Sequence, residues 1–202
     1  MAIKMLKIGI LNLQGAVSEH YDITCKTVEE MNIEAEVKTV RYANDVSGCD
    51  GLIISGGEST VIGKILFERG IDKVIHDENI PIFGTCAGMV LLAKETNYEQ
   101  PLLGLMDMNV GRNSFGRQKD SFETELDILG YKYPGVFIRA PTLLSYDKSK
   151  EDIKILCTLD DTIVAIQQKH NIAMSFHPEL TEDTRIHQYF INEIIENKKE
   201  KL

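Results

Sequence analysis

The 202-residue sequence contains no tryptophan, no C-x-x-C pair and no long hydrophobic run. Zinc and redox motifs usually place two cysteines a few residues apart, whereas the four cysteines here are isolated from one another. We therefore expect no metal site, and free thiols in a reducing cytoplasm. No apolar stretch approaches the roughly 18 residues that a membrane helix needs, so contact with a membrane is not expected.

Positive charge is in deficit as well. The chain has 22 lysines and arginines against 31 aspartates and glutamates, a net charge of −9. Because an acidic surface repels phosphate backbones, nucleic acid is not an expected partner. With 43% hydrophobic and 26% charged residues, the composition is typical of a folded globular protein, and the length suits one domain over residues 1–202.

The first half of the chain alternates short apolar runs with helical patterns. This order predicts an α/β fold with a three-layer open sheet, mostly parallel, and helices on both faces. Ser18 is a plausible N-cap of the first helix. The expected strands are Lys7–Leu13, Ala35–Val40, Gly51–Ile54 and Pro81–Phe83, and the expected helices are Ser18–Met31, Ser59–Glu68, Ile71–Asp77 and Ala87–Lys94.

The second half has strand patterns with few helices between them, so antiparallel strands should be added to the sheet there. An amphipathic pattern over Arg185–Asn197 predicts a closing helix. The expected strands are Ser121–Ile128, Val136–Ile138, Ile153–Thr158, Ile163–Gln168 and Ile172–Phe176.

A candidate nucleophile stands between a predicted strand and a predicted helix. The segment Gly84-Thr85-Cys86-Ala87-Gly88 has the G-x-S-x-G elbow pattern with cysteine in place of serine. Such a turn exposes Cys86 at the carboxyl edge of the sheet, where the dipole of the next helix favours a thiolate and the Ala87 N–H is placed as an oxyanion donor. The alternative is a buried apolar cysteine, which is our interpretation of Cys25, Cys49 and Cys157.

A thiol nucleophile needs a positioned base, and His177 is the best candidate. It ends a strand-like run and continues as His177-Pro178-Glu179. In an extended segment residues two apart point the same way, so Glu179 could orient the imidazole as the third member of a triad. The other four histidines lack this context and are interpreted as surface or packing residues, although His20 follows a loop near the expected sheet edge.

Two further segments suit substrate binding. Paired glycines in Ser55–Thr60 let a backbone approach a ligand closely, so Gly56 or Gly57 is a candidate second oxyanion donor. A tight turn capped by Ser59 or Thr60 is the alternative. Arg112 and Arg139 follow predicted strands or lie in loops, where an arginine can hold a carboxylate bidentately or simply lie in solvent.

Six segments together resemble one family over about residues 7–190. The elbow and the H-P-E motif resemble triad-type (class I) glutamine amidotransferases, and the remaining segments are similar to the glutaminase subunits of pyridoxal 5′-phosphate synthases. The segments are Leu13-Gln14-Gly15-Ala16, Gly56–Thr60, Gly84–Gly88, Arg112–Gln118, Phe137–Pro141 and Ser175–Thr181.

This resemblance implies hydrolysis of L-glutamine to glutamate and ammonia, with no metal or organic cofactor. The ammonia would pass to a separate synthase subunit that builds pyridoxal 5′-phosphate, within a large hetero-oligomer of both chains. Cys86, His177 and Glu179 match the family's catalytic triad. The residues that match its glutamine-binding positions are Gly57, Glu58, Ser59, Arg112, Ile138 and Arg139.

Three alternatives remain open from the residues themselves. A glutaminase that serves another biosynthetic pathway would have the same triad and a different partner. A stand-alone cysteine hydrolase or peptidase would act without a partner and would not need the arginines. A non-catalytic subunit on the same scaffold would be expected to lack triad residues, and all three are present here.

Overall fold

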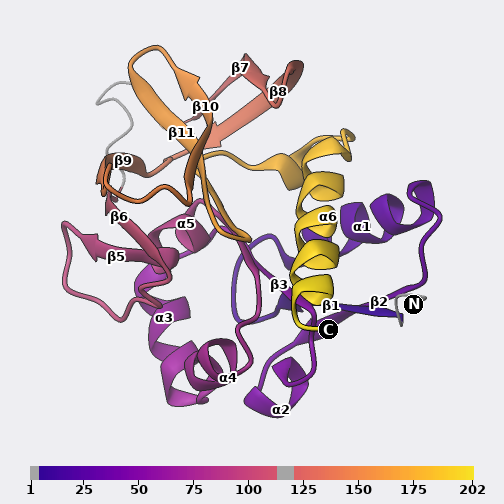
Figure 1. The fold of residues 1–202 in the computed structure, drawn as a ribbon. Helices are drawn as coiled ribbons and strands as arrows, with labels where there is room; N and C mark the ends of the chain where they lie inside the picture. Colours follow the sequence, from indigo (N-terminus) through magenta and orange to yellow (C-terminus); the bar gives the residue numbers. More distant parts are fainter. Residues whose placement is uncertain (1–4, 113–120) are drawn as a thin grey trace.

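The computed structural model describes residues 5–112 and 121–202, and its main feature is a seven-stranded sheet in the order β10-β11-β12-β4-β3-β1-β2 (Figure 1). The five strands from β12 to β2 are parallel, and β10 and β11 join them in antiparallel pairing. The strands are β1 (Leu6–Leu11), β2 (Ala35–Val40), β3 (Gly51–Ile54), β4 (Ile82–Thr85), β10 (Ile153–Leu159), β11 (Thr162–Gln168) and β12 (Asn171–Met174).

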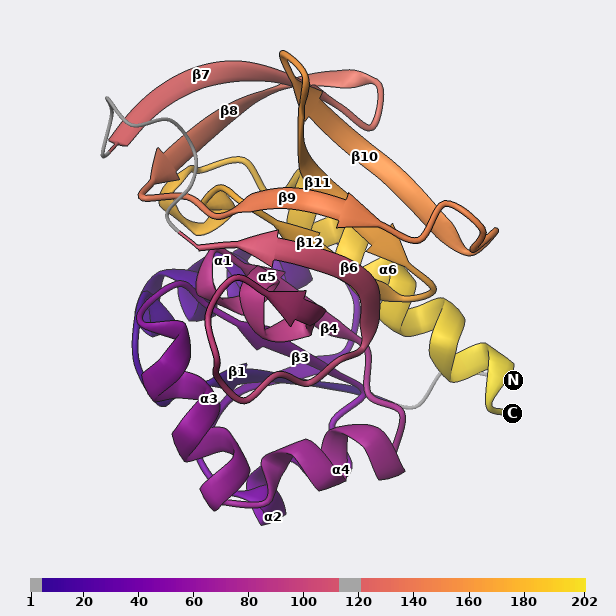
Figure 2. The same ribbon diagram turned by 90° about the vertical axis from the view of Figure 1, so that its left-hand side faces the viewer.

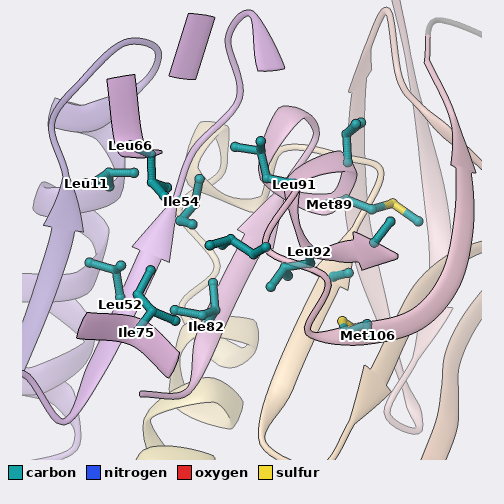
Figure 3. Packing of buried hydrophobic residues seen from close by; sticks show 14 of the residues in the cluster. Leu11, Leu52, Ile54, Leu66, Ile75, Ile82, Met89, Leu91, Leu92 and Met106 are labelled. Carbon is teal, nitrogen blue, oxygen red and sulfur yellow. The ribbon is translucent and has the colours of Figure 1, made fainter. Parts of the chain in front are cut away.

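Helices cover both faces of this sheet. Helices α1 (Val17–Glu30) and α6 (Arg185–Glu200) pack against one face, and α3 (Ser59–Glu68), α4 (Ile71–Asp77) and α5 (Ala87–Leu92) against the other. Figure 3 shows the core on the second face, where strand residues such as Ile54 meet Leu66 and Leu91 from the helices. The predicted α/β class, with helices on both faces and antiparallel additions, is confirmed.

Two smaller β structures flank the central sheet. Strands β5 (Ala93–Thr96), β6 (Met106–Gly111) and β9 (Thr142–Tyr146) form a three-stranded sheet, and β7 (Ser121–Ile128) pairs with β8 (Tyr131–Ile138). Figure 2 shows β7, β8 and β10 at the opposite end of the molecule from α4 and the short helix α2 (Ala43–Val46). Residues 113–118, the later part of the predicted arginine motif, lie outside the described residues.

Several predicted elements have the observed bounds, and others depart at one or both ends. The largest strand departure is β8, which was expected over Val136–Ile138 and begins at Tyr131. The bounds of β2, β3, α3, α4 and β7 agree with the prediction. Ser18 as an N-cap is wrong, because α1 begins one residue earlier and the Ser18 hydroxyl donates to Glu19. A side-chain cap from Ser59 or Thr60 is also wrong, since Glu58 is the N-cap of α3 and makes no side-chain capping bond.

The helix expected over Ala87–Lys94 is too long. Helix α5 ends at Leu92, because Ala93 has extended backbone angles (φ −66°, ψ 154°) and starts β5, which pairs with β6. The prediction missed α2, β5, β6 and β9. Helix α2 and strand β5 have only four residues each, and β6 and β9 pair with each other across an intervening segment. In the described part of the chain, no helix is long and apolar enough to span a membrane.

Candidate active site

The nucleophile elbow is present, with Cys86 at its apex between β4 and α5 (residues 82–85 and 87–92). Cys86 has φ 52° and ψ −106°, a strained conformation for a residue with a β-carbon. A β-carbon on Gly84 would lie 2.5 Å from the Gly88 carbonyl oxygen, and one on Gly88 would lie 2.1 Å from that of Ile54. The Cys86 N–H donates to Met174 of β12 at 2.8 Å, which ties the turn to the neighbouring strand.

His177 and Glu179 form a buried pair next to this elbow. Their side chains join through Nδ1 of His177 and Oε1 of Glu179 at 2.7 Å, and the two residues are 7% and 5% exposed. The pairing was predicted, but the reason was wrong, because residues 178–180 form a 3₁₀ turn (η1, Pro178–Leu180) and not an extended strand. The turn brings the Glu179 carboxylate within hydrogen-bond distance of Nδ1 of His177.

The protonation state of His177 follows from its two neighbours. Burial lowers the pKa of His177, but hydrogen bonding to Cys86 and Glu179 outweighs burial and raises that pKa to about 10. By strict hydrogen-bond geometry, Nε2 of His177 has no partner within the described residues, and the thiol makes a long 3.9 Å contact to the Ile138 carbonyl oxygen. The raised pKa of His177 keeps a proton on Nε2, so we take the Cys86 sulfur as the acceptor of that N–H.

Glu179 stays ionised although it is buried. Burial raises the pKa of its carboxyl, but the imidazoles of His20 and His177 outweigh that effect and hold the pKa below its usual range. The second carboxylate oxygen, Oε2, lies 3.3 Å from Nε2 of His20, a fully buried residue of α1. His20 was interpreted as a surface or packing residue, and its contact with Glu179 was missed.

The glycine turn lies directly against His177 and Cys86. A β-carbon on Gly56 would lie 2.6 Å from Cε1 of His177 and 3.4 Å from Cβ of Cys86. Gly57 has φ 140°, a value that side chains rarely adopt. Beside it, the side-chain carbonyl of Gln14 accepts the Glu58 N–H at 2.7 Å and so fixes the start of α3.

Arg112 reaches the same site from the end of β6. Its guanidinium forms an ion pair with Glu58 and lies over the Tyr98 ring, 4.8 Å from the ring centroid. The Arg112 N–H donates to the Asn97 side chain at 3.0 Å. These contacts hold a cation and an anion side by side at the site, and neither Asn97 nor Tyr98 was predicted to support them.

A cavity of about 340 Å³ connects these groups, a size within the range of small-molecule sites. Among the predicted site residues, only Gly56 and Glu179 are absent from its lining, and both lie directly behind His177. Gln14, Val90 and Pro141 line it without having been predicted. The lining residues are Gln14, Gly57, Glu58, Ser59, Cys86, Ala87, Val90, Arg112, Ile138, Arg139, Pro141 and His177.

The arrangement suits acyl transfer. A thiol stands in a polar cavity beside an imidazole that a buried carboxylate orients, which is the geometry of a nucleophile, its base and an orienting group. Within residues 5–112 and 121–202, no three histidine, cysteine or acidic side chains form a group that could hold a metal ion.

The chain is similar to one family over most of its length. A model of the SNO glutamine amidotransferase family matches residues 10–196. The pyridoxal 5′-phosphate synthase subunit PdxT of Methanobrevibacter smithii is 71% identical over 191 residues, which cover 95% of this chain and 98% of that protein. The subunit of the same name from Methanothermobacter thermautotrophicus is 59% identical with the same coverage.

Solved structures share the fold. A crystal structure of a glutamine amidotransferase superposes with a TM-score of 0.81 at 42% identity, and the match covers 93% of this chain and 98% of that one. A GMP synthase subunit from Thermoplasma acidophilum superposes with a TM-score of 0.68 at 17% identity, over 98% of each chain. At that identity the second likeness concerns the fold alone.

Proposed function

This chain belongs to the SNO glutamine amidotransferase family, and from that premise we propose that it is the glutaminase subunit of a pyridoxal 5′-phosphate synthase, acting in vitamin B6 biosynthesis. The observation that carries the proposal is the buried His177–Glu179 pair beside Cys86, in a cavity that also holds the Arg112–Glu58 ion pair. Cys86, with the His177–Glu179 pair beside it, supplies a thiol nucleophile. The Arg112–Glu58 ion pair matches the two charges of an amino acid.

Glutamine binding uses both charges of that ion pair. The α-carboxylate of glutamine binds the Arg112 guanidinium, and its α-ammonium binds the Glu58 carboxylate. Gly57, Ser59, Ile138 and Arg139 line the rest of the cavity, and they complete the proposed glutamine site. The side-chain amide of glutamine then extends toward Cys86.

The reaction proceeds through a thioester. The Cys86 thiolate attacks the amide carbon of the glutamine side chain, and the N–H groups of Ala87 and of Gly56 or Gly57 stabilise the oxyanion. The C–N bond breaks as the His177 imidazolium donates its proton to the departing ammonia, while Glu179 holds the ring in place. His177 then accepts a proton from water, whose oxygen attacks the γ-glutamyl thioester and releases glutamate and the thiolate.

The ammonia product goes to a synthase subunit, which makes pyridoxal 5′-phosphate. In the proposed assembly the two chains form a large hetero-oligomer in the cytoplasm, and the glutaminase works mainly when docked. The steps above use protein groups and water, and they call for no metal and no organic cofactor.

The test is release of ammonia from glutamine, measured with and without the synthase subunit. Cys86→Ala should lower turnover at least about 10⁴-fold, since removal of the nucleophile costs at least that much in a serine protease with a catalytic triad, while the melting temperature stays near that of the wild type. Cys25→Ser, which changes a half-buried thiol outside the cavity, is the matched control and should keep full activity.

Two results would contradict the proposal. Near-wild-type ammonia release by Cys86→Ala would remove the thiol from the mechanism. Full activity of the isolated chain, unchanged by the synthase subunit, would show that the partner is wrong.

A further inference from the structure

His20 is a buried titratable residue that the steps above do not use. It lies in α1, is fully buried, and contacts side chains from three other parts of the fold. Its Nε2 lies 3.3 Å from Oε2 of Glu179 and 3.1 Å from the Thr85 hydroxyl oxygen, and its Nδ1 lies 3.2 Å from Nε2 of His187.

The charges around the ring select one tautomer of His20. An unprotonated Nε2 would direct a lone pair at the negative Oε2 of Glu179, whereas an N–H there directs a hydrogen at it. With Nε2 protonated, Nδ1 is free to accept the N–H of His187. Nδ1 of His187 has no hydrogen-bond partner within the described part of the chain, as suits a nitrogen without a proton.

His20 is neutral in this arrangement. Burial lowers the pKa of His20, and the charges of Glu179 and Glu19 only partly offset burial, while His177 lowers the pKa further. Burial and the neighbouring His20 lower the pKa of His187 well below the usual value. Above its lowered pKa the ring therefore supports the Glu179 carboxylate through an N–H dipole, whereas the charge interaction that lowers the pKa of Glu179 requires the protonated ring.

Oε2 of Glu179 depends on this N–H. The Glu179 side chain is fully buried, and Oε2 has no hydrogen bond of ordinary geometry among the described residues. Nε2 of His20 lies 3.3 Å from Oε2, in a contact shared with the Thr85 hydroxyl. A buried carboxylate oxygen without a donor is costly, so loss of this N–H would turn the carboxylate or protonate it.

We propose that His20 is a positioning residue of the glutaminase, whose Nε2–H holds Oε2 of Glu179 so that Oε1 stays on His177, and that His187 sets the tautomer of His20. The inference rests on the proposed function and adds a fourth and a fifth residue to the line that begins at Cys86. Neither histidine lines the substrate cavity, so the expected effect falls on turnover and not on glutamine binding.

Two amide substitutions of His20 distinguish the effect of losing the Nε2–H donor from the effect of losing the volume of the ring. The side-chain amide of His20→Gln can place an N–H where Nε2 lies, whereas the shorter amide of His20→Asn reaches only the Nδ1 position, next to His187. Thr27→Val is the matched control, because Thr27 is a buried residue two turns along α1 whose hydroxyl donates to the Ile23 backbone carbonyl, away from Glu179.

Two measurements are made on each variant. The first is kcat and KM for glutamine in the complex with the synthase subunit, across pH. We expect His20→Asn to lose roughly 10- to 100-fold in kcat, the usual cost of losing a hydrogen bond to a charged group, with KM within about twofold. His20→Gln should recover kcat to within a few-fold of the wild type, and Thr27→Val should match the wild type.

The pH profile gives a readout that a packing role would not change. Without its donor, Glu179 takes up a proton at higher pH, so the acidic limb of kcat/KM should move to higher pH in His20→Asn. The second measurement, the rate at which iodoacetamide alkylates Cys86 as a function of pH, should show the same displacement. Alkylation can be measured without glutamine hydrolysis, and mass spectrometry identifies the peptide that contains alkylated Cys86.

The outcomes are distinguishable. The inference is overturned if folded His20→Asn has the turnover and the pH profile of the wild type. It is also overturned if His20→Asn and His20→Gln lose the same share of activity and that loss follows their loss of stability. If His20→Asn does not fold, His20→Leu, which fills the ring volume without a donor, is compared with His20→Gln by the same criteria. If the wild type hydrolyses no glutamine with its synthase, the proposed function fails, and alkylation of Cys86 still tests His20.

Discussion

Replacing Gly56 by alanine should disable the triad while leaving the fold intact. The added β-carbon would lie 2.6 Å from Cε1 of His177 and 3.4 Å from Cβ of Cys86. The backbone angle φ of Gly56 lies outside the left-handed region, so alanine adds no backbone strain. The alanine also keeps the backbone N–H, so any loss of activity comes from crowding and not from a missing oxyanion donor.

The magnitude follows from the displacement of the ring. Ordinary contact with a β-carbon begins at 3.4 Å, so the imidazole must retreat by about 0.8 Å from its position at 2.6 Å. His177 is held on Glu179 at 2.7 Å, and a retreat of that size breaks either this bond or the alignment with Cys86. Because a misplacement of about 1 Å can cost about 10²-fold in rate, we expect kcat to fall by roughly that factor.

The assay is glutamine hydrolysis in the complex with the synthase, together with thermal unfolding of the isolated chain. Gly70→Ala is the control, since Gly70 has φ 66° and no atom within 4 Å of an added β-carbon. That change should lower stability by about 1 kcal/mol through backbone strain and leave kcat unchanged. Gly56→Ala should show the reverse: a lower kcat with nearly unchanged stability.

A Gly56→Ala protein with kcat within about twofold of the wild type would refute this reasoning. It would mean that His177 can move by most of an ångström at no catalytic cost. A large loss of both kcat and stability would also refute it, because the crowding would then act on the fold as a whole.

Two further predictions concern binding and pH. Arg112→Lys keeps the positive charge but loses the guanidinium that pairs with Glu58 and stacks on Tyr98. We therefore expect KM for glutamine to rise roughly 10- to 100-fold, with a smaller change in kcat. An unchanged KM would show that Arg112 does not bind glutamine. His170 lies between Glu193 and Glu200 at 2.9 and 3.1 Å; burial lowers the pKa of His170, but these two hydrogen bonds outweigh burial and raise it above 6.5. A raised pKa stabilises the folded state fully below pH 6.5, and the stabilisation is lost as pH rises through the folded-state value. Urea unfolding should therefore show His170→Gln less stable than the wild type at about pH 6, with the difference shrinking above neutrality, and a difference that grows with pH would contradict the assignment.

Some of the site was predictable because its causes are local. The elbow at Cys86 depends on five consecutive residues, and the two glycines at its ends are required by contacts within β3, β4 and α5. The His177–Glu179 pair was predictable because the two residues are two apart in sequence, although the turn that joins them was not. That residues 1–202 form one domain stays a prediction.

Other parts of the site depend on contacts between distant segments. Tyr98 and Asn97 support Arg112 from a segment that carries no motif, and Gln14 reaches Glu58 across the sheet edge. Strand β9 has no clear alternation, whereas β6 alternates apolar and polar residues over Met106–Val110 and was overlooked; β6 pairs with both β5 and β9. Such contacts leave no signal in a single sequence, because no periodicity or spacing relates the partners.

The amino-acid sequence was enough to predict the elbow at Cys86, the His177–Glu179 pair and a mostly parallel α/β sheet, because elbows, turns and hydrophobic runs are set by neighbouring residues. The packing of the elements was needed to find that His20 of α1 lies 3.3 Å from Glu179 and that Gly56 leaves no room beside His177. Burial explains the difference. A histidine closed off from water by α1, β4 and α6 acquires its protonation state and its partners from the packing of those elements, and its own segment contains neither.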